Sequence, residues 1–101
     1  MKVTKENFEN EVLKCEKTVL VDLYADWCGP CRMLSPILEK IGAERDDLKI
    51  CKINVDEEEE LSGKFGVSSI PMLALVKDGK IVRTDVGYRP EEAVLRFIDG
   101  K

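Results

Sequence analysis

The segment Thr18–Tyr24 is the feature that most limits how this chain can fold. Its sequence, TVLVDLY, is rich in β-branched residues and apolar at almost every position. A strand of this kind is buried on both faces, as in sheets that lie between layers of helices. The chain has 101 residues, which is enough for one hydrophobic core and too few for two. We therefore expect a single domain, residues 1–101, built around this strand.

Helical and extended patterns alternate along the rest of the chain. Apolar residues at positions 8, 12 and 15 predict an amphipathic helix over residues 5–15. The same spacing at positions 33, 34, 37, 38 and 41 predicts a helix over residues 30–45 that bends near Pro36. Residues 48–56 form an apolar run typical of a second buried strand, and residues 57–65 are expected to be helical, with acidic residues in the first turn.

The last third of the chain predicts a hairpin and a closing helix. Asp78 and Gly79 separate residues 72–77 from residues 80–86, and this dipeptide is a strong signal for a two-residue turn between antiparallel strands. Pro90 suits the first turn of a final helix. This order of elements predicts an α/β fold in which a central mixed sheet of about five strands, the last two an antiparallel hairpin, lies between about four helices.

Composition and charge exclude several classes of function. The formal net charge is -4 and the basic residues are not clustered, so we expect no nucleic-acid binding. No apolar run approaches the roughly 18 residues that would span a bilayer, and the first residues lack the apolar stretch of a secretory signal. We therefore expect no membrane association and a cytoplasmic location. Since no pattern demands a second copy, we also expect a monomer.

Cys28 and Cys31 follow the central strand and begin the second predicted helix. A C-x-x-C pair at a helix N-terminus brings two sulfurs within bonding reach, while the helix dipole and free backbone N–H groups stabilise a thiolate on the first cysteine. Cys28 is thus expected to attack a disulfide, and Cys31 to displace the product and close an internal Cys28–Cys31 disulfide. Between them, Pro30 stiffens the spacer and Gly29 leaves room for a partner chain.

The same spacing also occurs in half of a zinc site, which needs two further ligands. The chain contains no histidine, and its other cysteines are Cys15 and Cys51. A redox pair is therefore favoured over a metal site. We expect Cys15 and Cys51 to be small buried apolar residues, and the alternative is a regulatory thiol or an ancillary disulfide.

Several short motifs resemble the thioredoxin family, and together they extend over nearly the whole chain: WCGPC at 27–31, Val21-Asp22 before it, and Ile70-Pro71, a hairpin and Gly87 after it. The resemblance implies a thioredoxin fold and a protein-disulfide reductase that supplies electrons to disulfide-containing client proteins and so maintains cell redox homeostasis. A thioredoxin reductase would return the disulfide to the dithiol, and no bound cofactor is implied. The competing hypotheses are an oxidase or isomerase, and an interaction module that holds a partner without turnover.

Asp22 is the one charged residue in the central strand, and it shares a strand face with Leu20 and Tyr24. It should be buried, and burial tends to raise the pKa of a carboxyl group. The resemblance implies that Asp22 exchanges a proton with Cys31 and that Lys52, on the neighbouring strand, is its partner. The alternative is that Asp22 faces solvent from an edge strand.

The resemblance also implies a surface that docks substrate beside the cysteines. Pro71 resembles the cis-proline that faces the two sulfurs in this family, and the alternative is a trans-proline at the start of an edge strand. Met72 follows it where threonine is usual in the family, and a flexible thioether beside the sulfurs would change which partners fit. The expected docking residues, each of which could instead be packed in the core, are Trp27, Ile70, Pro71, Met72, Val86 and Gly87.

Overall fold

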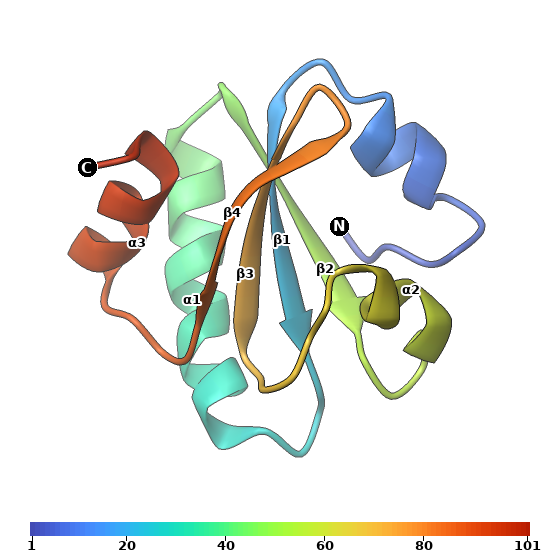
Figure 1. Ribbon diagram of the computed structural model, residues 1–101. Coiled ribbons are helices and arrows are strands. Elements are labelled where there is room, and N and C mark those ends of the chain that lie inside the picture. The colour runs from blue at the N-terminus through green and yellow to red at the C-terminus, as the bar shows by residue number, and fades with distance from the viewer.

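Four helices and four strands follow one another in the order that the sequence pattern predicts (Figure 1). The structure is a computed structural model and describes residues 1–101. Its elements in chain order are η1 (Glu9–Leu13), β1 (Thr18–Tyr24), α1 (Gly29–Glu44), β2 (Leu48–Asn54), α2 (Glu59–Lys64), β3 (Met72–Lys77), β4 (Lys80–Val86) and α3 (Glu91–Asp99). The strands form one sheet between two layers of helices, which confirms the predicted α/β fold.

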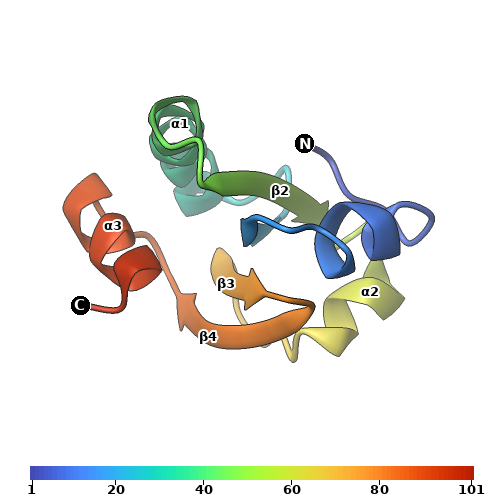
Figure 2. The ribbon, with the colours of Figure 1, turned by 90° about the horizontal axis from the view of Figure 1, so that it is seen from above.

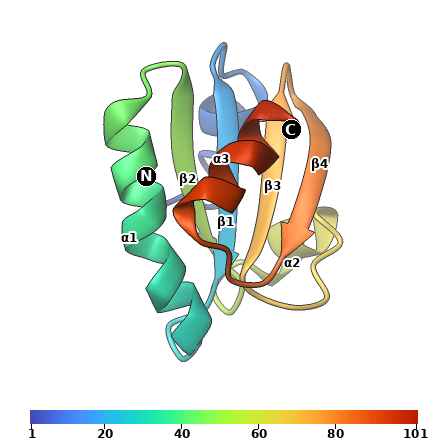
Figure 3. The ribbon, with the colours of Figure 1, turned by 90° about the vertical axis from the view of Figure 1, so that its left-hand side faces the viewer.

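The strands lie side by side in the order β2-β1-β3-β4, as Figure 3 shows. β1 runs parallel to β2 and antiparallel to β3, and β3 and β4 form an antiparallel hairpin. The turn of this hairpin is Asp78-Gly79, with φ angles of 52° and 77°. A two-residue turn with positive φ at both positions matches the twist of the flanking strands. The predicted hairpin is therefore confirmed.

The sheet has four strands and not the predicted five or so. Near the N-terminus, Lys2 forms an isolated parallel bridge with Lys52 of β2, and the N–H of Val3 donates to the carbonyl of Lys52 at 2.8 Å. This pairing stops at Thr4, whose N–H donates to the side-chain oxygen of Asn7 at 2.8 Å and begins a turn. The extended N-terminal segment is thus too short to form a fifth strand.

The helices differ from the predicted ranges mainly at their ends. Residues 5–15 contain five residues of π-helix, η1, where a longer α-helix was expected. The N–H of Lys14 bonds to the carbonyl of Glu9, five residues back, which is the hydrogen-bond pattern of a π-helix. α1 continues through Pro36, and α3 begins directly after Pro90. No helix is both long enough and apolar enough to cross a membrane.

Helices cover both faces of the sheet, with α1 and α3 on one side and η1 and α2 on the other (Figure 2). Because side chains alternate along a strand, even-numbered residues of β1 face α1 and odd-numbered ones face α2. The core on the α1 side comprises Leu20, Leu34, Leu38, Ile41, Leu48, Leu73, Leu75, Val94 and Ile98. The core on the α2 side includes Val12, Val19, Val21, Cys51, Ile53, Leu61, Phe65 and Ala74. Asp22 therefore lies on the face that α1 covers.

Candidate active site

Cys28 and Cys31 lie where the carboxyl end of β1 leads into α1. Cys28 caps the helix, and Cys31 lies in its first turn. The two cysteines form a disulfide, with their Cα atoms 5.2 Å apart. Their exposed fractions are 4% and 2%. A reaction partner must therefore come into close contact with the protein around Cys28.

The N-terminus of α1 provides the electrostatics that a reactive thiol needs. The sulfur of Cys28 accepts a hydrogen bond from the backbone N–H of Cys31 at 3.2 Å. Free N–H groups and the helix dipole favour negative charge at this end, so the same contact stabilises a thiolate once the disulfide is open. No acidic residue lies in the first turn of α1 to oppose that charge. The space beside the Cα of Gly29 is open, which leaves room for a partner chain.

Asp22 is fully buried, and together with Cys31 it lines a cavity of about 300 Å³ between β1 and α1. Neither of its carboxyl oxygens has a hydrogen-bond partner. Burial raises the pKa of Asp22 to about 6, while the positive charge of Lys52 acts in the opposite direction. The expected burial is confirmed, and the alternative of a solvent-facing Asp22 is wrong. The carboxyl can thus exchange a proton close to neutral pH.

Lys52 lies directly opposite Asp22 on the neighbouring parallel strand β2. Its ammonium group does not bond to the carboxyl, whose oxygens are both unpartnered. The Nζ atom instead donates a hydrogen bond to the hydroxyl of Ser35 on α1 and lies 5.3 Å from the centre of the Tyr24 ring. The interaction of Lys52 with Asp22 is therefore electrostatic and acts across the cavity.

The peptide bond between Ile70 and Pro71 is cis, so the alternative of a trans-proline is wrong. Pro71 is buried, and its carbonyl accepts a hydrogen bond of 2.7 Å from the N–H of Gly87. Gly87 has a φ of 99°, in the left-handed region that favours glycine. Ile70 packs against the small buried cluster that holds the disulfide. The loop before β3 is thus tied both to the segment after β4 and to the cysteines.

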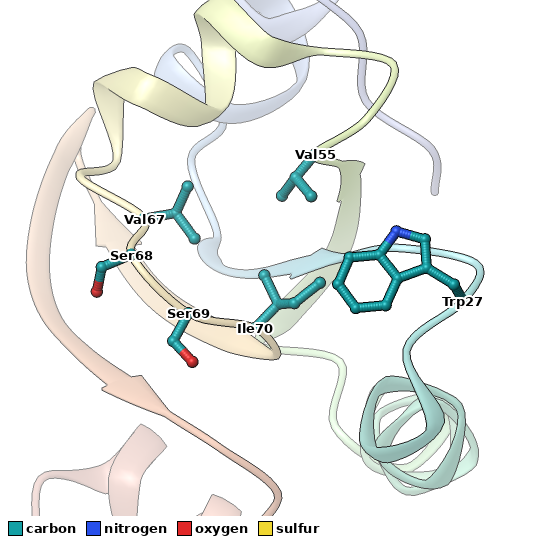
Figure 4. A pocket seen from close by; sticks show the side chains of 6 residues that line it. All are labelled: Trp27, Val55, Val67, Ser68, Ser69 and Ile70. Atoms are coloured by element: carbon teal, nitrogen blue, oxygen red, sulfur yellow. The ribbon is translucent and has the colours of Figure 1, made fainter.

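A groove of about 460 Å³ lies between Trp27, the residue before Cys28, and Ile70 (Figure 4). Figure 4 shows the ring of Trp27 and the side chain of Ile70 turned toward one another. Trp27 is 69% exposed, and its indole N–H donates a hydrogen bond to a carboxylate oxygen of Asp56 at 2.8 Å. Val55 and Ile70 belong both to the groove and to the packing around the disulfide. The residues that line the groove are Trp27, Val55, Val67, Ser68, Ser69 and Ile70.

Comparison with known proteins agrees with this geometry. Over residues 1–100 the chain matches the sequence profile of the family described as Thioredoxin. The chain belongs to the thioredoxin family. It is 47% identical over 100 residues to Thioredoxin of Bacillus subtilis (strain 168), which covers 98% of this chain and 94% of that protein. The thioredoxins of Listeria monocytogenes and Pseudomonas aeruginosa are 52% and 43% identical over 98 residues, which cover 96% of this chain and 93% and 91% of theirs.

Membership of this family gives the activity. Thioredoxins are disulfide oxidoreductases, and this chain is a protein-disulfide reductase. Cys28 and Cys31, joined in a disulfide, fit the C-x-x-C active site of a thioredoxin and form a redox-active pair. Thioredoxins generally act with thioredoxin reductase and with disulfide-containing target proteins. The predicted thioredoxin fold is also confirmed, with four strands where about five were expected.

Met72 lies in the core, which is the alternative that the sequence left open for each expected docking residue. Its side chain is 4% exposed and belongs to the core on the α2 side, where it pairs with Leu23 across the sheet. It is not among the residues that pack around the disulfide. The cause is the strand register, which turns Met72 away from α1. Val86, its partner across the hairpin, is 40% exposed.

Two contacts of the site were missed from the sequence. Asp56 was not expected among the site residues, yet its carboxylate accepts a hydrogen bond from the indole of Trp27. Its signal is its place just after β2, because the carboxyl ends of parallel strands meet at one edge of a sheet. Ser35 was not considered, and its signal is its position one helical turn after Cys31. Both contacts join elements that are distant in sequence.

The two remaining cysteines lie on the opposite side of the sheet. Cys51 is fully buried in the core on the α2 side, and Cys15 is half-buried against the same core. Burial raises the pKa of the Cys51 thiol, which keeps it in its unreactive protonated form. Both thiols are free in the structure, and their surroundings are typical of small apolar residues.

Proposed function

We propose that Cys28 is the nucleophile of this thioredoxin and that Cys31 is its resolving cysteine. The observation that carries the assignment is the position of the Cys28 sulfur, which caps α1 and accepts the N–H of Cys31. In the dithiol form, the Cys28 thiolate attacks one sulfur of a client disulfide, and the other client sulfur leaves as a thiolate. Cys31 then attacks Cys28 and releases the second client thiol. Two electrons pass to the client, and the Cys28–Cys31 disulfide closes.

We propose that Asp22 accepts the proton of Cys31 during the second step. A thiol must lose its proton before it attacks, and Asp22 lines the same cavity as Cys31. The pKa of Asp22, raised by burial to about 6, suits a group that takes up and returns a proton near neutral pH. Lys52, across the cavity, is the partner whose charge moderates this effect. Gly29 and Pro30 serve as the spacer that keeps the two thiols close enough for the disulfide to form.

We further propose that clients dock along the groove between Trp27 and Ile70. Trp27 and Ile70 supply an exposed apolar surface at one end, next to Cys28. The hydrogen bond from the N–H of Gly87 to the carbonyl of Pro71 holds the neighbouring backbone in place. Val86 extends the apolar surface along the edge strand. Met72 supports this surface from the core and does not contact the client.

Further aspects of the proposal concern partners and organisation. The electron donor is a thioredoxin reductase, and the clients are proteins with accessible disulfides. A dithiol reductase works in a reducing compartment, which favours the cytoplasm. The chain acts as one domain, residues 1–101, because both cores pack on a single sheet. It works as a monomer, since the redox cycle uses one pair of cysteines from one chain.

Turbidity from insulin reduction tests the assignment, with dithiothreitol or NADPH and thioredoxin reductase as the electron source. Cys28→Ser should abolish activity, whereas Cys31→Ser should accumulate a mixed disulfide with the client that a thiol reductant releases. Cys15→Ser is the matched control and should retain the wild-type rate. Full activity of Cys28→Ser would refute the proposal. Client binding that survives loss of both cysteines, with negligible turnover in the wild type, would indicate an interaction module instead.

A further inference from the structure

The ammonium group of Lys52 is held in place from two sides. Its Nζ donates a hydrogen bond to Ser35 Oγ and lies 5.3 Å from the centre of the Tyr24 ring. Ser35 follows Cys31 by four residues on α1, so its hydroxyl lies on the helix face that lines the same cavity. Tyr24 lies two residues after Asp22 on β1 and shares its strand face. Three elements therefore meet around one cation.

The protonation of Asp22 depends on the charge of Lys52, because the carboxyl group of Asp22 has no hydrogen-bond partner of its own. The other titratable or charged groups around the cavity are Tyr24, Asp26, Cys31 and Arg32. Asp26 is exposed, and Arg32 is held by a hydrogen bond of 2.9 Å to the backbone carbonyl of Asp26. Burial raises the pKa of Asp22, and Lys52 is the charge that opposes this effect. The position of Lys52 thus affects the protonation of Asp22 more than any other nearby side chain does.

Lys52 would not keep this position without an acceptor. A lysine ammonium is strongly hydrated and sits on a flexible four-carbon stem, so it moves readily into water. The side chain is half-buried and can reach solvent. An aromatic ring alone holds an exposed cation weakly. The hydroxyl of Ser35 is the acceptor that keeps the charge in the cavity.

We propose that Ser35 is a positioning residue, whose hydroxyl holds Lys52 in the cavity beside Asp22 and thereby sets how readily Asp22 exchanges a proton with Cys31. The proposal deepens the roles proposed above for Asp22 and Lys52. Ser35 does not touch the reacting atoms. It acts through Lys52, and its effect should disappear when the charge of Lys52 is absent.

A carboxyl titration of Asp22 by carbon NMR, in the oxidised full-length protein, tests this chain of contacts. Four proteins are compared: wild type, Ser35→Ala, Lys52→Met and the double variant. Alanine is a strong helix former, so Ser35→Ala should fold, and the amide spectrum verifies this. We expect Ser35→Ala to raise the pKa of Asp22 by about half a unit to one unit, and Lys52→Met to raise it further. The double variant should match Lys52→Met, because Ser35 has no effect without the lysine.

Ser35→Thr is the conservative control, since it keeps a hydroxyl and should restore the wild-type titration. An Asp22 pKa that is unchanged or lowered in Ser35→Ala would overturn the proposal. An equal rise caused by Ser35→Ala in the Lys52→Met background would overturn it as well, because Ser35 would then act on Asp22 directly. The titration measures the pKa of the Asp22 carboxyl group directly, so its outcome is independent of whether Asp22 takes the proton of Cys31. That role is tested separately by the pH profile of client reduction in Asp22→Asn.

Discussion

Asp22→Asn should remove a pH-dependent cost of folding that the buried carboxyl imposes. In the unfolded chain this carboxyl has the ordinary pKa of 3.8, and in the folded protein burial raises the pKa to about 6. The folded state therefore holds the proton more tightly than the unfolded state. Below pH 3.8 both states are protonated and there is no cost. As the pH rises from 3.8 to about 6, the unfolded chain gives up this proton while the folded protein keeps it on a fully buried group, so stability is lost, and the full cost is present above about 6.

The size of this effect follows from the two pKa values. Each pKa unit corresponds to about 1.4 kcal/mol, so the complete cost is about 3 kcal/mol at high pH. Part of the loss has already occurred at pH 4, which leaves about 2 kcal/mol between pH 4 and pH 8. This is a large fraction of the stability of a small domain, about 5–15 kcal/mol. Asparagine has nearly the same shape and does not titrate, so the cost of burying its amide is the same at both pH values.

Urea unfolding of the oxidised protein at pH 4 and pH 8 measures the effect. The wild type should lose about 2 kcal/mol more stability than Asp22→Asn between these pH values. Taking the difference between the two proteins removes the contribution of the other titrating groups, which both proteins share. Asp46→Asn is the matched control, because Asp46 is exposed and forms no ion pair, and it should follow the wild type. Equal losses in the wild type and Asp22→Asn would refute the reasoning, since Asp22 would then titrate alike in both states.

Three further predictions concern two glycines of the fold and the contact between Asp56 and Trp27. Gly87→Ala should destabilise the protein by about 1–2 kcal/mol in urea unfolding, because its φ of 99° strains any other residue, whereas Gly29→Ala, in open space, should be nearly neutral. Gly42→Ala should cost about 1–3 kcal/mol in the same assay, because a Cβ there would lie 2.7 Å from a side-chain carbon of β2. Asp56→Ala should free the ring of Trp27 and lower kcat/KM for insulin reduction about 2–10-fold, together with a change in tryptophan fluorescence; an unchanged kcat/KM would remove the ring from the docking surface.

Local chemistry explains which parts of the fold could be predicted from the sequence. The Asp78-Gly79 turn is determined by two residues that accept positive φ, and β1 by its own apolar, β-branched run. α1 shows its helical spacing on both sides of Pro36. The missing fifth strand is a different case. Its pairing with β2 depends on how many N-terminal residues lie alongside β2 near Lys52 before the turn at Thr4. No local sequence pattern gives that number.

In the site, too, the features that depend on local sequence could be predicted, and those that depend on long-range pairing could not. The cysteine pair and the cis-proline stand in motifs, so the sequence indicated them directly, and the burial of Asp22 followed from the apolar run around it. Ser35 lies on a helix and Lys52 on a strand 17 residues later, and they meet because β2 pairs parallel to β1 under α1. Such contacts require the register of the strands.

Met72 shows why that register was not available from the sequence. β3 is buried at every position from Met72 to Val76, so its residues do not alternate between apolar and polar types. A strand that alternates reveals which face each residue occupies, whereas a continuously apolar strand fits the sheet in either orientation, and a shift by one residue exchanges the two faces. In the structure Met72 pairs with Val86 and lies in the core on the α2 side, in a register that an irregularity between Leu75 and Val76 shifts by one residue from the pairing next to the turn. A substitution at Met72 should therefore change core packing and stability, and client preference should depend on the groove between Trp27 and Ile70.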